Sequence, residues 1–448
     1  MSALAAFAAD LGASVSGSDR DYDAGSGAGI YGMLLEKGIR LVPQDGRGLD
    51  PSFDLMVIST AVESANPDIK RAQSIGISIE PRPEFLARIV GESRTIAVAG
   101  TNGKSSTAGM LAWVMRELGL DPGFIGGGRV KQFRSGANVG NSLPGGSGPL
   151  VVEACESDTA IASYSPQVTV LLNLSFDHRE ISDTASLFQS LLDNTRGRVI
   201  INGDDERLSS MKTEKRLSFG LGEGCDVRAT HIGCEALESR FMVDGTEFRL
   251  ALPGRHNIYN ALSVIAVLKD MGIPVESMVR PLAEFTGLDR RFDIHLNSGG
   301  FLVVDDYAHN PDKIAALMET VSSDRETGRE GILYIFQPHG YGPTRLLKDR
   351  YVETFRICLR REDRLVILPI FYAGGTVAKD ISSADIISPL ADAGLDVRSA
   401  PDRDFILKSL RGWKTIVVFG ARDETLSNLA GKIAGKVARN IAGSIASD

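Results

Sequence analysis

Residues 95–107 read TIAVAGTNGKSST, and this stretch decides the fold of the middle of the chain. Its first five residues form a short apolar run typical of a buried strand, and a helix-length segment, residues 106–118, follows the run. The glycines at 100 and 103 let the backbone turn so that its N–H groups and the start of the helix face a phosphate chain. We therefore predict a nucleoside triphosphate site in which Lys104 reaches the outer phosphates and a hydroxyl ligates Mg²⁺.

The loop departs at one position from the common pattern G-x-x-x-x-G-K-[ST], because residue 98 is Val rather than Gly. The alternative is a glycine-rich strand-to-helix turn with a chance Lys-Ser pair, and the flanking strand and helix make that the weaker interpretation. The predicted nucleotide-binding residues are Gly100, Thr101, Asn102, Gly103, Lys104, Ser105 and Ser106.

Similar apolar runs recur on both sides of the loop, beginning near residues 54, 150, 168, 198, 301, 332, 364 and 415. Helix-length segments lie between many of them, as at 257–271, 312–322 and 426–441. This alternation predicts an α/β fold of open, doubly wound sheets, whose ligands bind at the carboxyl ends of the strands. Composition shifts near residues 80–93 and 285–293 divide the chain into three units, which we expect at 1–92, 93–288 and 289–448.

Three local features complete this outline. The Ala-rich stretch at residues 1–11 predicts a helix that ends at Gly12. The glycine-rich residues 126–148 predict a mobile loop, and residues 223–250 predict short antiparallel strands.

Length and composition limit the class of protein. The 448 residues are enough for two to four domains at roughly 150 residues each. With 49 Lys+Arg against 57 Asp+Glu, the chain lacks the basic excess that a nucleic-acid partner requires. Four widely spaced cysteines predict buried thiols in a reducing compartment, and neither a membrane span nor a signal peptide is visible, so we expect a cytoplasmic protein without a membrane partner.

Two polar sets follow neighbouring strands of the middle unit. EACESD stands at 153–158 and NLSFDH at 173–178. Taken alone, each set is more typical of a helix cap, a solvated turn or a hydrogen-bonded Asp-His pair. Beside a phosphate loop in the same sheet, their carboxylates and imidazole predict Mg²⁺ ligands for phosphoryl transfer.

With these motifs in place, the sequence resembles the Mur ligase family, and within it the branch that joins L-alanine to UDP-N-acetylmuramate. The ordered signatures are GTNGKSST at 100–107, EACESD at 153–158, NLSFDH at 173–178, GRHNIYNA at 254–261, RRFD at 290–293, DDYAHNPD at 305–312 and FQPHGY at 336–341. They cover most of the chain. The resemblance implies a Rossmann-like UDP-binding domain, a central ATPase domain and a carboxyl-terminal Rossmann-like domain.

The resemblance also implies a role for each matching residue. Ser105, Glu156 and His178 would bind Mg²⁺, and Asn257 and Asn260 would hold adenine, although alone they would be ordinary cap and surface residues. From the third domain, Arg291 would reach the phosphates, Asp306 the ribose and His309 the reacting groups. The residues implied in catalysis are Lys104, Glu156, His178, Arg291 and His309.

The implied reaction is ATP-dependent amide formation for peptidoglycan synthesis. The carboxylate of UDP-N-acetylmuramate attacks the γ-phosphate of ATP, and the amine of L-alanine then displaces phosphate from the acyl phosphate. Ser16, Asp19 and Ser59 would contact the nucleotide sugar, and His339 and Arg345 the amino acid. ATP and Mg²⁺ are the implied cofactors, and the chain would act as a monomer or a homodimer.

Several positions depart from the alanine-adding pattern. Asn102 stands where that branch usually has His. Gly340 stands where that branch has an Arg directly after Pro-His, and we expect Arg345 to replace that Arg as the partner of the amino-acid carboxylate. A ligase for another acceptor, such as a preformed peptide, and a silent nucleotide-binding homologue therefore stay open. The family's opening strand and G-x-G-G-x-G loop precede a helix like the one at residues 1–11, so we expect the first sheet to lack a strand and the UDP site its glycine cradle.

Overall fold

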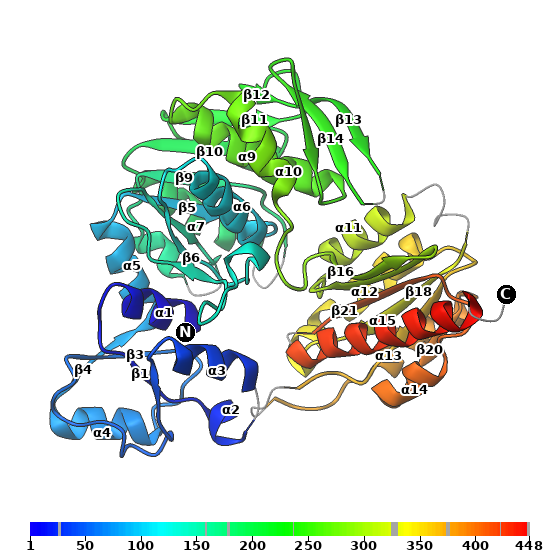
Figure 1. The fold of residues 1–448 in the computed structure, drawn as a ribbon, viewed down its shortest axis with the longest axis horizontal. Helices are drawn as coiled ribbons and strands as arrows, with labels where there is room; N and C mark the ends of the chain where they lie inside the picture. Colours follow the sequence, from blue (N-terminus) through cyan, green and yellow to red (C-terminus); the bar gives the residue numbers. More distant parts are fainter. Residues whose placement is uncertain are drawn as a thin grey trace. The chain divides into compact units, whose positions relative to one another are not determined.

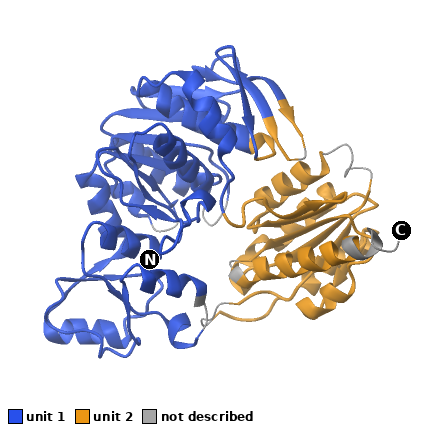
Figure 2. Ribbon diagram, viewed as in Figure 1, with its two compact units in different colours: residues 1–232, 240–251, 257–288 blue, residues 233–239, 252–256, 289–448 orange. Residues whose placement is uncertain are grey.

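The structure is a computed structural model that describes residues 1–25, 28–156, 159–176, 180–235, 237–323, 330–372, 377–421 and 423–445 (Figure 1). The chain divides into two compact units (Figure 2). Unit 1 comprises residues 1–232, 240–251 and 257–288, and unit 2 comprises residues 233–239, 252–256 and 289–448. Each unit is built around its own sheet, as the strand–helix alternation predicted.

The amino-terminal part of unit 1 contains two separate two-stranded parallel sheets. Strand β1 (Ser16–Gly17) pairs with β2 (Arg40–Leu41), and β3 (Leu55–Ile58) pairs with β4 (Ser78–Pro81). All four residues of β3 are only half-buried, although they are apolar. The helices of this part are α1 (Ser2–Asp10), α2 (Arg20–Asp23), α3 (Ala28–Glu36), α4 (Pro67–Ile75) and α5 (Arg82–Glu92).

The rest of unit 1 is an eight-stranded sheet in the order β12-β11-β10-β9-β5-β8-β6-β7. Its pairs are parallel except that β7 runs antiparallel to β6. The strands are β5 (Thr95–Ala99), β6 (Gly123–Ile125), β7 (Ser142–Leu143), β8 (Leu150–Glu153), β9 (Val168–Leu171), β10 (Arg198–Asn202), β11 (Arg216–Gly220) and β12 (Val227–Arg228). The helices are α6 (Lys104–Glu117), α7 (Ile181–Asp193), α8 (Glu206–Ser209), α9 (Arg255–Asp270) and α10 (Val279–Glu284), with 3₁₀ turns η1 (Lys131–Phe133), η3 (Ala160–Ser163) and η4 (Val275–Met278).

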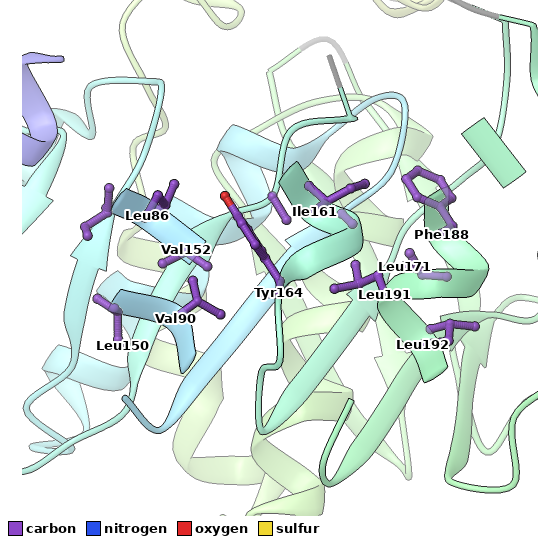
Figure 3. Packing of buried hydrophobic residues seen from close by; sticks show 14 of the residues in the cluster. Leu86, Val90, Leu150, Val152, Ile161, Tyr164, Leu171, Phe188, Leu191 and Leu192 are labelled. Atoms are coloured by element: carbon purple, nitrogen blue, oxygen red, sulfur yellow. The ribbon is translucent and has the colours of Figure 1, made fainter. Parts of the chain in front are cut away.

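The core on one face of this sheet is formed by α1, α5, η3 and α7 (Figure 3). Leu86 and Val90 of α5 lie at one side of this cluster and Phe188 of α7 at the other, with Tyr164, just after η3, between them. Ala3, Leu4 and Phe7 of the predicted Ala-rich helix belong to the same cluster, so α1 packs on the central sheet. Burying a large apolar side chain stabilises the fold by about 1.5–3 kcal/mol, which explains why this short helix is held firmly.

Unit 2 contains a six-stranded sheet in the order β16-β17-β21-β18-β19-β20, parallel except for the antiparallel pair β16 and β17. Helix α15 and α14 bury apolar side chains against one face, including Ile406, Leu429 and Ile433. The strands are β16 (Asp293–Ser298), β17 (Phe301–Asp306), β18 (Ile332–Gln337), β19 (Arg364–Ile367), β20 (Val397–Ser399) and β21 (Thr415–Gly420). The helices are α11 (Pro311–Ser322), α12 (Tyr341–Cys358), α13 (Ala384–Asp392), α14 (Arg403–Lys408) and α15 (Glu424–Ile445).

The stretch 126–148, predicted as a mobile loop, contains the short elements η1 and β7, which pairs with β6, and its mobility stays a prediction. Two other sequence-based expectations need correction. Within 223–250, β12 joins the large sheet, and only β13 (Thr230–Cys234), β14 (Ser239–Val243) and β15 (Thr246–Leu250) form a separate three-stranded sheet. The four cysteines are free thiols as predicted, but they are partly exposed rather than fully buried. No helix in the described ranges is long and apolar enough to cross a membrane.

Candidate active site

The phosphate loop connects β5, which is buried along its whole length, to α6. Gly100 and Gly103 have φ angles of 141° and 86°, a region that residues with a side chain rarely adopt. A Cβ atom on Gly103 would also lie 2.6 Å from Oδ1 of Asn260, and one on Gly100 would lie 3.0 Å from Cβ of Leu172. Both glycines are therefore required by conformation and by space.

The loop is held from the next strand by Asn173 and Ser175, which sequence reasoning had not singled out. The Asn102 N–H donates to Oδ1 of Asn173 (2.8 Å), and Nδ2 of Asn173 donates back to the Asn102 carbonyl (3.0 Å). The Ser175 N–H donates to Oγ1 of Thr101 (3.0 Å), and the Thr101 N–H donates to the Asn173 carbonyl (3.0 Å). These reciprocal bonds fix the turn in front of α6. The only sequence signal for them was the position of NLSFDH at the end of a neighbouring strand.

Lys104 is the first residue of α6 and its ammonium group points back over the loop. Its Nζ donates to the carbonyls of Gly100 (2.6 Å) and Thr101 (3.1 Å) and forms an ion pair with Oε2 of Glu156 (2.8 Å). Burial, the largest single influence, would lower the pKa of Lys104, but the neighbouring groups, Glu156 foremost, together outweigh burial and raise it. The structure thus brings Lys104 and Glu156 together and keeps a permanent positive charge at the start of the helix.

Glu153, the last residue of β8, belongs to the predicted motif EACESD, but the family resemblance assigned the metal to Glu156 and gave Glu153 no role. Its Oε1 accepts from the hydroxyl of Ser105 (2.9 Å), and its Oε2 accepts from the N–H of Gly127 (2.8 Å). Serine and carboxylate oxygens are ligands that Mg²⁺ prefers. Ser105 and Glu153 therefore fit a magnesium ion beside the phosphate loop, whereas Glu156 is committed to Lys104.

His178, the third predicted metal ligand, lies outside the described residues. Among the residues that are described, no cluster of three or more His, Cys, Asp or Glu side chains suits a metal ion. A metal at Ser105 and Glu153 would therefore complete its coordination with water, nucleotide or residues beyond the described ranges.

Asn257 and Asn260 are buried on the first turns of α9. Oδ1 of Asn260 accepts from the hydroxyl of Thr107 (3.1 Å), and its Nδ2 donates to Oδ1 of Asn257 (3.1 Å). The pair therefore joins α9 to α6, directly against Gly103. Ser106, on α6, is half-buried.

In the amino-terminal part, the predicted sugar-binding residues lie at two loops. Oγ of Ser16 accepts from Nε of Arg40 (3.1 Å), and Asp19 is the N-cap of α2, accepting from the Asp21 N–H (2.9 Å). Oγ of Ser59 accepts from the Ala61 N–H (3.3 Å) just after β3. An exposed ion pair between Arg20 and Glu63 joins these two loops.

In unit 2, the predicted nucleotide residues gather around Tyr307. The guanidinium of Arg291 lies over its ring, 5.0 Å from the centroid, and Nδ1 of His309 is 2.8 Å from the Tyr307 carbonyl oxygen. Asp306, at the end of β17, accepts from the N–H groups of Phe292 (2.7 Å) and Ala308 (2.7 Å). Burial raises the pKa of Asp306, and the positive charge of Arg291 opposes that rise.

The acceptor residues His339 and Arg345 flank the start of α12. His339 stacks on Phe371, with ring centroids 6.0 Å apart. Arg345 forms an ion pair with Asp380 and donates to the carbonyl of Ala378 (3.0 Å). Its guanidinium is therefore already paired within the protein. Arg345 could bind the carboxylate of an incoming amino acid only if its ion pair with Asp380 were broken.

Gly340, the N-cap of α12, has φ 70° and ψ 142°, a conformation open to glycine and strained for an arginine. Lys379 lies over the rings of Tyr372 (4.9 Å) and Tyr341 (5.9 Å). An arginine at position 340 would therefore be strained in the backbone that this turn adopts.

Comparison with known proteins decides the family. The model of the Mur ligase family, catalytic domain, matches residues 1–94, that of the Mur ligase middle domain matches 98–268, and that of the Mur ligase, glutamate ligase domain, matches 290–422. A UDP-N-acetylmuramate–L-alanine ligase of Hydrogenovibrio crunogenus is 32% identical over 393 residues, which cover 84% of this chain and 82% of that relative. The chain belongs to the Mur ligase family. This Mur ligase has the three-domain α/β architecture that the sequence predicted, and unit 1 contains most of the residues matched to the first two domains.

Solved structures agree on the fold. A UDP-N-acetylmuramate-alanine ligase from Thermotoga maritima superimposes with a TM-score of 0.79 at 24% identity, covering 98% of this chain and 97% of that one. A murein peptide ligase from Psychrobacter arcticus gives a TM-score of 0.65 at 21% identity, covering 99% and 96%. The Mur ligase is thus an ATP-dependent ligase, as the predicted phosphate loop required.

Proposed function

We propose that this Mur ligase joins L-alanine to the carboxylate of UDP-N-acetylmuramate, with ATP hydrolysed to ADP, in the synthesis of peptidoglycan precursors. The observation that carries the proposal is the phosphate loop, in which Lys104 is held over the turn by Glu156 while Ser105 faces Glu153. The 32% identity to a ligase of that name over most of both chains supports the choice of substrates.

The loop residues 100–106 would bind the ATP phosphates, with Lys104 leaving Glu156 for the β- and γ-phosphates. Asn257 and Asn260 would hold adenine, Arg291 the phosphates and Asp306 the ribose. We add Glu153 to Ser105, Glu156 and His178 as a ligand of Mg²⁺, because Glu153 is the carboxylate that contacts Ser105. When bound, the metal supplies positive charge to the reacting phosphate oxygens.

The chain's own residues supply the rest of the chemistry. Lys104 offsets the negative charge that develops when the sugar carboxylate attacks the γ-phosphate, and Arg291 would add a second cation from unit 2. The amine then displaces phosphate from the acyl phosphate without a covalent enzyme intermediate. Ser16, Asp19 and Ser59 would contact the nucleotide sugar, and His309 the reacting groups.

A second acceptor class is favoured by the start of α12. Gly340 replaces an arginine and Arg345 is paired with Asp380, so the usual partner of a small amino acid's carboxylate is absent or engaged. A longer acceptor, such as a preformed peptide, would be recognised along its length and would depend less on that arginine. His339 and Arg345 would flank either acceptor.

The test is ADP release by the purified full-length chain with ATP, Mg²⁺, UDP-N-acetylmuramate and a panel of acceptors. We expect release to require both the sugar nucleotide and an acceptor, with L-alanine the best substrate. Faster release with a peptide would select the second acceptor class. Release that is independent of the sugar would contradict the proposal, and a Lys104→Ala variant with full physiological activity would indicate a silent nucleotide-binding homologue.

The proposal also includes the domain boundaries, the compartment and the oligomeric state, which we propose to be a monomer or a homodimer. The domain boundaries are placed at 92/93 and 288/289. The four free thiols are consistent with a cytoplasmic enzyme. Limited proteolysis would check the boundaries, and sedimentation would distinguish the monomer from the homodimer.

A further inference from the structure

Arg291 lies between two residues with unusual backbones at the beginning of unit 2. Arg290 has φ 58° and Phe292 has φ 46°, and neither is a glycine. Left-handed conformations at residues with a side chain persist only where the surroundings enforce them, and they concentrate at functional turns. The surroundings of Arg290 and Phe292 must therefore hold this turn in place.

Arg290 is anchored by its side chain, which is only 7% exposed. Its Nε lies 3.3 Å from Oδ2 of Asp305, a carboxylate that is fully buried, and its Nη1 donates to the carbonyls of Ala421 (2.9 Å) and Asp423 (3.0 Å). Its own carbonyl accepts from the Tyr307 N–H (2.8 Å). The guanidinium thus ties the turn to the ends of two neighbouring strands, β17 and β21.

The second anchor is Asp306, which follows Asp305 directly. Since successive side chains of a strand point to opposite sides, Asp305 reaches Arg290 in the interior while Asp306 accepts from the N–H of Phe292 (2.7 Å). Two adjacent carboxylates therefore hold the two residues on either side of Arg291. Arg291 itself is left to lie over Tyr307.

We propose that Arg290 is a positioning residue for nucleotide binding, because its buried pair with Asp305 fixes the turn that presents Arg291. This inference rests on the proposed role of Arg291 at the phosphates. Arg290 contacts no reacting group. Arg290 acts indirectly, because the backbone that it fixes sets the direction in which the Arg291 side chain points.

The competing explanation is that the pair only stabilises unit 2. Removing one partner of a buried pair destabilises a protein in any case, because a charge is left without compensation. A stability measurement alone therefore cannot separate the two explanations. The pair Arg360 and Asp363 in the same unit offers a control, because Asp363 is likewise fully buried (2.6 Å, Nη2 to Oδ1). Asp363 accepts from the N–H of Ile332, the first residue of β18, whereas Asp305 lies near the carboxyl end of β17.

The experiment compares Arg290→Met and Arg360→Met in the full-length chain by ADP titration with Mg²⁺ and without sugar or amino acid. We expect both variants to have a lower Tm, and only Arg290→Met to bind ADP about 10-fold more weakly, the loss typical of a removed supporting contact. Arg291→Ala should weaken ADP binding much less in the Arg290→Met background than in the wild type, because the two residues act as a unit. Wild-type ADP affinity in Arg290→Met, or full additivity with Arg291→Ala, would overturn the inference.

If Arg290→Met does not fold, Arg290→Lys replaces it. Lysine keeps the charge but lacks the planar fork that reaches both Asp305 and the two carbonyls, so we expect an intermediate ADP affinity, and wild-type affinity would overturn the inference. An unchanged ADP affinity in Arg291→Ala alone would also overturn it, because nothing would then be positioned. Since ADP binding is measured without the other substrates, failure of the proposed ligase activity would leave this comparison intact.

Discussion

The phosphate loop of unit 1 and the Arg291 turn of unit 2 both present a cation from an irregular backbone, but they obtain that backbone in different ways. In the loop, Gly100 and Gly103 adopt positive φ angles without a steric cost, and backbone groups make most of the supporting bonds. In the turn, Arg290 and Phe292 adopt positive φ angles although they carry side chains, and Asp305 and Asp306 hold them there.

This difference predicts how each region fails. A turn made by glycines is destabilised when a side chain is added, because a residue with a side chain is strained at these φ angles and its Cβ atom would collide with neighbouring atoms. An anchored turn fails when a side chain is removed, because the backbone then relaxes to a commoner conformation. The following changes test this contrast, beginning with the cation itself.

The largest effect is expected from Lys104→Ala. It removes the charge that faces the phosphates and leaves Glu156 without its partner, so kcat/KM should fall by about 10³, the size of loss seen when a preorganised transition-state contact is removed. ADP release measures the effect. Lys348→Ala, which alters an exposed lysine beside Asp349, is the control and should retain wild-type activity. A loss below 10-fold would show that Lys104 is not the main cation of the site.

Gly103→Ala should be the next most harmful change. The new methyl group would meet Oδ1 of Asn260 at 2.6 Å in addition to the positive φ, so we expect a loss of about 3 kcal/mol in the free energy of unfolding. Gly119→Ala separates the two causes, since Gly119 has φ 72° but open space around it, and it should cost only about 1 kcal/mol. Denaturant titration measures both variants. Equal losses would show that contact with Asn260 does not constrain the loop.

Glu153→Gln tests the metal site that we propose beside the loop. The amide keeps the size and one oxygen but removes the charge beside Ser105, so the Mg²⁺ concentration for half-maximal activity should rise by about 10- to 100-fold. Glu223→Gln, an exposed carboxylate elsewhere in unit 1, should leave the Mg²⁺ requirement unchanged. If both variants need the same Mg²⁺ as the wild type, Glu153 only orders Gly127 and Ser105.

Arg290→Gly is the direct way to break the contrast between the regions. Glycine removes the strain of the positive φ but also the contacts with Asp305, Ala421 and Asp423, and we expect the loss of anchoring to dominate, with about 10-fold weaker ADP binding. His231→Gly is the control, because His231 is exposed at φ 50° and should tolerate glycine. Unchanged ADP affinity in Arg290→Gly would mean that the conformation alone matters.

The same contrast explains what could be predicted from the sequence. Glycines beside Lys104 reveal their conformation by their identity, so the loop, its strand and its helix were predicted correctly. Nothing in the letters RRFD shows that Arg290 and Phe292 have positive φ angles, because those angles follow from tertiary bonds to Asp305 and Asp306.

Side-chain partners were equally hidden where they depend on the fold. Glu153 and Glu156 stand three residues apart in one motif, and only the geometry shows that Ser105 contacts the first and Lys104 the second. Arg345 was expected to face the acceptor, but Asp380 lies 35 residues away and its approach to Arg345 cannot be inferred from spacing. The strands themselves were predictable because their buried apolar runs are local.

Asp204 in unit 1 provides the test with the smallest expected effect, because it is a carboxylate that accepts from backbone N–H groups, as Asp306 does in unit 2. It accepts from the N–H groups of Leu221 (2.6 Å) and Gly222 (3.0 Å) and from the hydroxyl of Tyr259 (2.8 Å), next to Asn260 on α9. Burial would raise the pKa of Asp204, but these hydrogen bonds outweigh burial and lower it. The folded state therefore binds this proton less readily than the unfolded chain, so the carboxylate stabilises the fold above its unfolded pKa and loses that contribution as the pH falls through the folded pKa.

Asp204→Asn should accordingly lower the free energy of unfolding by a few tenths of a kcal/mol at pH 7, a small effect because the group is exposed and screened by solvent. The difference from the wild type should begin to shrink below about pH 4, the pKa of an unfolded aspartate, and should be lost as the pH falls through the lower pKa of the folded state. Denaturant titrations at several pH values measure the difference, with Asp349→Asn as an exposed control. A difference that stays constant between pH 7 and pH 3 would show that the shape of the Asp204 side chain, and not its charge, anchors α9 beside the phosphate loop.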